Sequence, residues 1–179
     1  TDRAGRPVLN LKQTNFSVMG DGKPQQISDF GATSAPFEVA LLLDTSGSTR
    51  DDLPLIRRAG QNFINSLRPG DRVSIVAFKT ETKDGRSGPS IDMLTGLTGD
   101  RAVLTSALER VGTSNGTPYY DSLLKVAETV FDEPAKPEFR GRRALVALTD
   151  GVDSTSVSDF AEARELLAAA GIICYFIQV

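Results

Sequence analysis

Three short polar segments carry side chains that could hold a divalent cation. They read Asp44-Thr45-Ser46-Gly47-Ser48, Gly116-Thr117-Pro118 and Thr149-Asp150-Gly151-Val152-Asp153. Aspartate, serine and threonine supply only oxygen, which hard cations such as Mg²⁺ and Mn²⁺ prefer in octahedral geometry. The chain has no histidine and a single cysteine. Ser-His-Asp and Cys-His catalysis and the usual histidine-ligated zinc sites are therefore excluded, and any metal must be bound through oxygen.

The first segment alternates potential ligands with small residues. An extended turn places the side chains of Asp44, Ser46 and Ser48 on one side, because successive side chains alternate along such a backbone. Alone, this pattern is weakly specific, since Ser48 or Thr49 could simply cap a following helix. The combination with the other two segments is what favours a metal site.

The periodicity of the chain predicts the elements that position these segments. Apolar runs of strand length alternate with segments of helical period, which is typical of βαβ units and a parallel sheet. Strands are expected at 37–43, 73–78, 90–94, 144–148 and 172–179, with a polar, glycine-rich loop over 80–89. Helices are expected from the apolar stripes that begin at Leu53, Val103, Leu123 and Phe160, the last one ending at Gly171. The predicted fold is α/β: a doubly wound, mostly parallel, Rossmann-like sheet flanked by helices.

Two of the polar segments follow strands that are apolar on both faces, at 39–43 and 144–148. Such runs are typical of central parallel strands covered by helices. In an open parallel sheet, ligands bind in the crevice outside the carboxyl ends of the strands. Asp44 and Asp150 are therefore expected to be neighbours there.

The order of these residues resembles a known family. Asp44-x-Ser46-x-Ser48, then Thr117, then Asp150-Gly151 look like the metal-ion-dependent adhesion site (MIDAS) of von Willebrand factor A (VWA) domains, also called integrin I-type domains. All five positions are present in the family's order, and the resemblance covers roughly residues 37–179. It implies a VWA fold and a module for cell adhesion or other protein-protein interaction, without enzymatic activity.

The resemblance also implies roles for the five residues around a Mg²⁺ or Mn²⁺ ion. Ser46 and Ser48 would bind the metal directly, Thr117 directly in the ligand-engaged state, and Asp44 and Asp150 largely through water. An ion held by neutral hydroxyls keeps most of its positive charge, so it seeks the Asp or Glu carboxylate of a protein partner. Direct ligation by Asp150 would weaken partner binding and couple affinity to movement of the last helix.

Several neighbouring residues have two interpretations. Asp121 could accept a hydrogen bond from a metal-bound hydroxyl and so orient it, or it could be one of the acidic residues favoured at helix N-termini. Asp153 is equally an ordinary loop residue and is not counted as a ligand. Of Tyr119 and Tyr120, at least one is expected in the core, and the other could contact a partner.

Composition limits the partners. The net charge is −3, the sequence pI is near 5.0, and the chain has no extended basic stripe, so nucleic acid is not an expected partner. No apolar run approaches the roughly 20 residues needed to span a bilayer, so direct membrane insertion is not expected. The expected location is extracytoplasmic (secreted, periplasmic or cell surface), as part of a longer protein.

The N-terminal 36 residues differ from the rest. Short apolar stretches at 16–19 and 26–30, separated by 20–23, predict a β-hairpin. We expect residues 1–36 to be a β extension or the remnant of a preceding β-domain, and 37–179 to be the VWA domain lacking its last helix and strand. One consequence would be that the N-terminal segment completes the edge of the main sheet. The stretch from Asp2-Arg3-Ala4-Gly5-Arg6-Pro7-Val8 through Asp21-Gly22-Lys23-Pro24 also resembles the segment that precedes the A domain in a bacterial subgroup abundant in acidobacteria.

Two other functions fit parts of this sequence pattern. A phosphotransferase of the haloacid dehalogenase type also places an aspartate after its first central strand, but it needs a second aspartate two residues on, and Ser46 stands there. A metal-independent VWA scaffold for complex assembly would keep the fold and bind through a helix face. The intact set of ligand residues favours the metal-dependent alternative.

Overall fold

The computed structural model of the 179-residue chain describes residues 5–6, 8, 10–27, 30, 35–47, 49–83, 86–113, 116–132 and 141–178. The chain divides into two compact units, Thr1–Ser34 and Ala35–Val179. None of the helices in the described part is long and apolar enough to cross a membrane.

The N-terminal unit contains the expected β-hairpin, with different bounds. After a short 3-10 helix, η1 (Gln13–Asn15), β1 (Val18–Gly20) pairs antiparallel with β2 (Lys23–Gln25). Asp21 (φ 50°) and Gly22 (φ 74°) connect them, with the positive φ values that a type I′ turn requires. This tight turn sets the register and places the second strand at 23–25 rather than in the apolar stretch 26–30. β1 and β2 form a two-stranded sheet of their own, and the expectation that this segment completes the main sheet stays a prediction.

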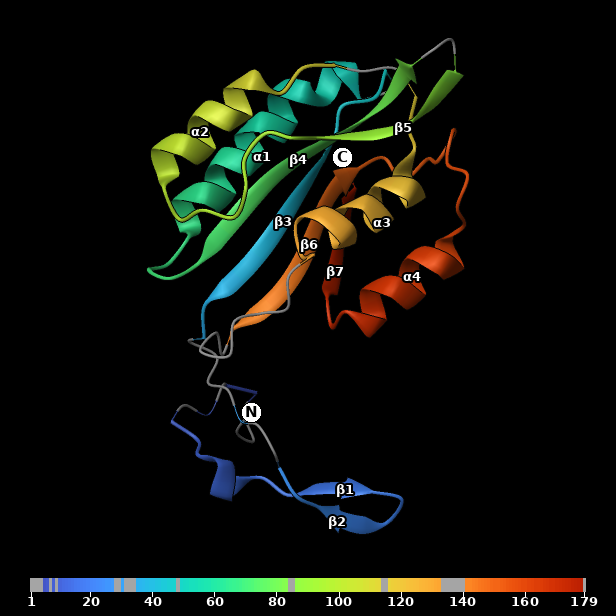
Figure 1. Ribbon diagram of the computed structural model, residues 1–179. Coiled ribbons are helices and arrows are strands. Elements are labelled where there is room, and N and C mark those ends of the chain that lie inside the picture. The colour runs from blue at the N-terminus through green and yellow to red at the C-terminus, as the bar shows by residue number, and fades with distance from the viewer. Residues whose placement is uncertain are drawn as a thin grey trace. The chain divides into compact units, whose positions relative to one another are not determined.

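The second unit is a sheet between two layers of helices (Figure 1). Its strand order is β5-β4-β3-β6-β7, in which β3 pairs parallel with β4 and β6, β6 pairs parallel with β7, and β4 pairs antiparallel with β5. The strands are β3 (Phe37–Asp44), β4 (Arg72–Lys83), β5 (Arg86–Met93), β6 (Arg142–Thr149) and β7 (Ile173–Gln178). The helices are η2 (Arg50–Asp52), α1 (Leu53–Ser66), α2 (Arg101–Arg110), α3 (Tyr119–Thr129) and α4 (Phe160–Ala169). The predicted doubly wound, mostly parallel fold is confirmed.

β3 is buried on both faces, which explains its uninterrupted apolar sequence. Ala40 and Leu42 pack in the core shared with α3 and α4. The alternate residues Val39, Leu41 and Leu43 pack in the core shared with α1 and α2. Helices on both faces leave no position for a polar side chain between Val39 and Leu43, and the next residue, Asp44, ends the strand.

The prediction of a polar loop over 80–89 is wrong for most of these residues. β4 and β5 form a long hairpin whose register pairs Lys83 with Arg86. Antiparallel backbone pairing does not require apolar side chains, so the polar composition hid these strand residues. The predicted loop 133–140 lies outside the described residues.

A buried carboxylate fixes the amino ends of the three central strands. Glu38 on β3 is 2% exposed, and its register neighbours are Arg72 on β4 and Arg143 on β6. Arg143 Nε lies 2.9 Å from Glu38 Oε2, and Arg72 forms an ion pair with Oε1. The two arginines compensate the buried charge and hold the strands in one register.

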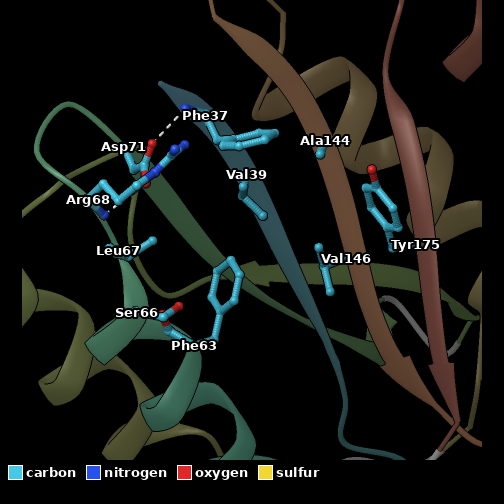
Figure 2. A pocket seen from close by; sticks show the side chains of 10 residues that line it. All are labelled: Phe37, Val39, Phe63, Ser66, Leu67, Arg68, Asp71, Ala144, Val146 and Tyr175. Carbon is cyan, nitrogen blue, oxygen red and sulfur yellow. Dashed lines mark hydrogen bonds and ion pairs between the residues drawn. The ribbon is translucent and has the colours of Figure 1, made fainter. Parts of the chain in front are cut away.

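On the α1 side of the sheet, a hollow of about 390 Å³ lies between the end of α1 and strands β3, β6 and β7. Figure 2 shows Phe63 on α1 opposite Val146 and Tyr175 on the sheet. Tyr175 is 51% exposed. In the described part of the chain, therefore, this face of β7 is only partly covered.

Asp71 connects the end of α1 to the start of β3 beside this hollow (Figure 2). Its Oδ1 accepts a hydrogen bond from the Phe37 amide (2.9 Å), and its Oδ2 accepts one from the Arg68 amide (2.8 Å) and pairs with the Arg68 guanidinium. Burial raises the pKa of Asp71, but the hydrogen bonds from Arg68 and Phe37 outweigh burial and hold this pKa below its usual value. The charged form of Asp71 therefore stabilises the fold.

Replacing Asp71 with asparagine should lower the free energy of unfolding at neutral pH by about 1–3 kcal/mol, because a part-buried donor loses its acceptor. The wild-type contribution is complete above about pH 4 and is lost as the pH falls through the lowered pKa, whereas Asp71→Asn lacks this acid-side loss. Urea unfolding over a pH series measures both effects, with Glu109→Gln on the exposed side of α2 as the control. Parallel pH profiles for wild type and Asp71→Asn would contradict this assignment.

Candidate functional site

The site is organised around Asp44, the last residue of β3, which is 0% exposed. Its Oδ2 accepts a hydrogen bond from the hydroxyl of Thr149 (2.7 Å), the last residue of β6. Its Oδ1 accepts one from the amide of Ser46 (2.9 Å) and lies 3.4 Å from the hydroxyl of Thr49. All these donors are neutral.

Asp44 differs in this respect from two other buried carboxylates of the fold, Glu38 and Asp71. Glu38 is paired with two arginines, and Asp71 is paired with Arg68. Among the described residues, no ion pair involves Asp44. Burying a carboxylate costs several kcal/mol of desolvation unless an opposite charge compensates it. A cation at this end of the sheet would supply that compensation.

The segment after Asp44 folds back on the strand end. Ser46 is buried, and Ser48 lies outside the described residues. The hydroxyl of Thr49 lies 3.1 Å from the carbonyl oxygen of Asp44 and 3.2 Å from that of Ser46. Thr49 precedes η2, but its side chain makes no capping hydrogen bond to that helix. The alternative that Thr49 merely caps the next helix is therefore wrong, because its hydroxyl closes the loop around Asp44.

Asp150 follows directly after β6 and is half-buried. The hydroxyl of Thr149, which donates to Asp44, also accepts a hydrogen bond from the Gly151 amide (3.0 Å). Gly151 has φ +79°, a conformation in which a side chain would be strained. Asp150 Oδ1 accepts from the amide of Val152 (3.0 Å). One threonine hydroxyl thus connects the loop of Asp150 to the carboxylate of Asp44.

Thr117 lies just before α3 and is buried. It is paired with Ser154: its carbonyl accepts from the Ser154 amide (3.0 Å), and its amide donates to the Ser154 hydroxyl (3.1 Å). Among the described residues, no hydrogen bond joins Thr117 directly to Asp44. The structure therefore attaches Thr117 to the loop that follows Asp150.

The carboxylate of Asp121, in the first turn of α3, binds that same loop. It accepts hydrogen bonds from the amides of Val157 (2.8 Å) and Ser158 (3.0 Å). Burial raises the pKa of Asp121, but hydrogen bonds from Ser158 and Val157 outweigh burial and hold this pKa below its usual range. Asp121 therefore anchors the loop, a role that neither sequence interpretation anticipated.

Two further residues have structural roles here that the sequence did not predict: Thr149, and Asp153, which was interpreted as an ordinary loop residue. The register of β3 and β6 pairs Leu43 with Leu148, so the next residues, Asp44 and Thr149, come level at the sheet edge. Asp153 Oδ2 accepts from the amides of Tyr119 (2.8 Å) and Tyr120 (3.2 Å) at the start of α3. A signal for Asp153 was present, because α3 follows Pro118, which offers no side-chain cap.

A hollow of about 470 Å³ lies beside Asp150 at the carboxyl ends of β6 and β7. Its lining combines Asp150 with the aromatic residues Tyr119, Tyr120, Phe160 and Phe176. Tyr119 is buried, as expected for one of the two tyrosines, and Tyr120 is half-buried. Phe160 is 48% exposed and Phe176 is 50% exposed. The hollow therefore presents an apolar surface next to a carboxylate.

The donor chemistry of this region fits a hard cation. In the described part of the chain, no three His, Cys, Asp or Glu side chains gather as a metal-binding cluster. A cation beside Asp44 would therefore depend on hydroxyl and water oxygens together with Asp44 and Asp150, a set suited to Mg²⁺ or Mn²⁺.

Comparisons with known proteins agree with this architecture. Residues 39–152, more than half of the chain, match the family model of the von Willebrand factor type A domain. A search of curated proteins finds no match. The narrower likeness to an acidobacterial subgroup stays a prediction.

Several solved structures share the fold. Proximal thread matrix protein 1 from the mussel byssus, with a zinc-occupied MIDAS motif, is 18% identical with a TM-score of 0.64 over 80% of this chain and 36% of that one. An aerotolerance-related membrane protein from Bacteroides fragilis is 19% identical with a TM-score of 0.59 over 80% of this chain and 67% of that one. The vWF domain of the pili tip protein Mfa5 from Porphyromonas gingivalis is 19% identical with a TM-score of 0.54 over 73% of this chain and 44% of that one.

At these identities the likeness to solved structures shows the fold alone, and the chain spans less than half of the mussel and Mfa5 chains. The family match rests on the sequence itself and covers the segments that carry Asp44, Thr117 and Asp150. This chain belongs to the von Willebrand factor type A domain family.

Proposed function

We propose that this domain is a divalent-metal-dependent protein-binding module that coordinates an acidic residue of its partner through a Mg²⁺ or Mn²⁺ ion. Asp44, Ser46, Ser48, Thr117 and Asp150 are the proposed metal-binding residues. The proposal rests on the fully buried carboxylate of Asp44 at the carboxyl end of a parallel sheet, whose hydrogen-bond donors among the described residues are all neutral. A bound cation would compensate the negative charge of the Asp44 carboxylate.

The mixture of ligands supports a carboxylate-binding role. Ser46, Ser48 and Thr117 offer neutral oxygens, and Asp44 and Asp150 contribute largely through water. When bound, the ion supplies a positive centre that is not fully neutralised by these groups, so an anionic oxygen from outside is favoured. The partner group is therefore an Asp or Glu side chain.

The surface around Asp150 supports a protein as the partner. Tyr120, Phe160 and Phe176 are partly exposed beside Asp150, and aromatic residues of this kind are enriched at protein interfaces. The similar structures include a byssus matrix protein and a pili tip protein. These likenesses support an adhesive, extracytoplasmic role, on a secreted, periplasmic or cell-surface protein.

Calorimetric titration of chelator-stripped protein with Mg²⁺, Mn²⁺ and Zn²⁺ tests the proposal. Wild type should bind one ion saturably, and Asp44→Ala and Ser46→Ala should each weaken binding by at least about tenfold. Zn²⁺ is included because the MIDAS motif of the mussel protein holds zinc. Asp100→Ala, which removes the aspartate capping α2, is the matched control and should bind like wild type. Absence of binding by folded wild type would leave a metal-independent scaffold.

The hydroxyl of Thr149 can be tested separately with Thr149→Val, which keeps the shape of the side chain. Loss of the donor to Asp44 and of the acceptor for Gly151 should weaken Mn²⁺ binding by about 10- to 100-fold. It should also lower the free energy of unfolding by about 1–3 kcal/mol. Thr149→Ser restores the hydroxyl and should recover most of both effects. Titration and urea unfolding of the two variants measure them, and equal Mn²⁺ affinity in Thr149→Val would contradict the role.

A further inference from the structure

The start of α3 is capped by the loop that follows Asp150 rather than by its own preceding residues. Pro118, at the N-cap position, makes no side-chain capping bond. The amides of Tyr119 and Tyr120 instead donate to Asp153 Oδ2, and the amide of Asp121 donates to the hydroxyl of Ser156 (3.1 Å). The first amides of a helix have no partner within the helix, so these acceptors satisfy groups that would otherwise be unpaired.

The capping is reciprocal. Asp121 in the first turn of α3 accepts from the amides of Val157 and Ser158, and Thr117 exchanges two hydrogen bonds with Ser154. We call this set of contacts between residues 117–121 and 153–158 the loop clamp. Because each side binds backbone groups of the other, Thr117 and the loop after Asp150 are held as one unit.

Both carboxylate oxygens of Asp153 are used within the loop clamp. Oδ2 accepts from Tyr119, Tyr120 and the Ser156 hydroxyl, and Oδ1 accepts from the Ser156 amide (3.2 Å). A negative charge at a helix N-terminus is also favoured by the helix dipole. These contacts place Asp153 among backbone donors, although it lies only three residues after Asp150. Any effect it has on a bound ion is therefore exerted through other residues.

We propose that Asp153 is a positioning residue of the metal site: through the loop clamp it fixes Thr117 relative to Asp150. This inference rests on the proposed function. The connection runs from Asp153 through the start of α3 and Ser154 to Thr117, while Asp150 is linked through Gly151 and Thr149 to Asp44. Without the loop clamp, Thr117 would lose its defined place relative to the other proposed ligands, because it has no hydrogen bond of its own to Asp44 among the described residues.

The matched pair for the test is Asp153→Ala and Asp159→Ala. Asp159 caps α4 at the far end of the same loop, where its Oδ1 accepts from the Glu162 amide (2.9 Å). Both variants remove one helix cap, so they should lower the thermal unfolding midpoint by similar amounts. In Mn²⁺ titrations, Asp153→Ala should weaken binding by about 10- to 100-fold. Asp159→Ala should stay within about twofold of wild type, since distant sites act nearly independently.

A double-mutant cycle identifies the route. If Asp153 acts through Thr117, adding Asp153→Ala to Thr117→Ala should change the Mn²⁺ affinity by no more than about twofold. Asp153→Asn keeps one acceptor oxygen and should recover part of the affinity lost in Asp153→Ala. A full, additive loss in the Thr117→Ala background would overturn the proposed route.

Hydrogen exchange of backbone amides in the metal-free protein measures whether the loop clamp is intact, independently of ion binding. The amides of Tyr119 and Tyr120 should exchange faster in Asp153→Ala than in wild type or Asp159→Ala. If wild type binds Mn²⁺ but Asp153→Ala binds as tightly as Asp159→Ala, the positioning role alone is overturned. If wild type binds no ion, the proposed function fails and the positioning role fails with it, whatever the exchange rates.

Discussion

The hydrogen bond from Thr149 to the buried carboxylate of Asp44 is the contact on which the site depends. It exists because β3 and β6 are adjacent, parallel and in one register, which pairs Glu38 with Arg143 at the amino ends and Leu43 with Leu148 near the carboxyl ends. The Glu38–Arg143 ion pair and the Asp44–Thr149 hydrogen bond therefore secure the same register from opposite ends. A shift by one residue would turn every apolar side chain of β3 to the wrong face and separate Asp44 from Thr149.

Buried carboxylates at the two ends of the sheet have different partners. At the amino ends, Glu38 and Asp71 are neutralised by arginines, so their role is confined to holding strands and helix together. At the carboxyl ends, Asp44 is surrounded by hydroxyl and amide donors that orient its carboxylate without cancelling its charge. Desolvating such a carboxylate is costly, and in the proposed function this cost favours binding of a cation. The loops around it, held by Thr49, Thr149 and the loop clamp, supply a defined arrangement of further oxygens.

Much of this arrangement could be predicted from the sequence, and the failures have physical reasons. The apolar runs around Leu41 and Val146 predicted central parallel strands, and this prediction also placed the loops of Asp44 and Asp150 side by side. Strands were predicted at 73–78 and 90–94, but their extension into the long β4–β5 hairpin was missed, because backbone pairing, unlike core packing, leaves no apolar pattern. Thr149 became visible only with the strand register. The missing cap at Pro118 indicated that α3 needs an acceptor from elsewhere, but it could not identify Asp153. The carboxylates of Asp153 and Asp121 accept from amides more than 30 residues away in the sequence, and no local pattern encodes such pairings.

Thermal unfolding of wild type and Asp44→Asn, each with and without Mg²⁺, tests whether a divalent cation balances the buried charge of Asp44. Removing a buried, uncompensated charge should leave the metal-free variant as stable as wild type or more stable. Mg²⁺ should raise the unfolding midpoint of wild type through binding to the native state and leave that of Asp44→Asn unchanged. A wild type that Mg²⁺ does not stabilise, together with a metal-free Asp44→Asn that is clearly less stable, would mean that Asp44 is structural and would contradict the account.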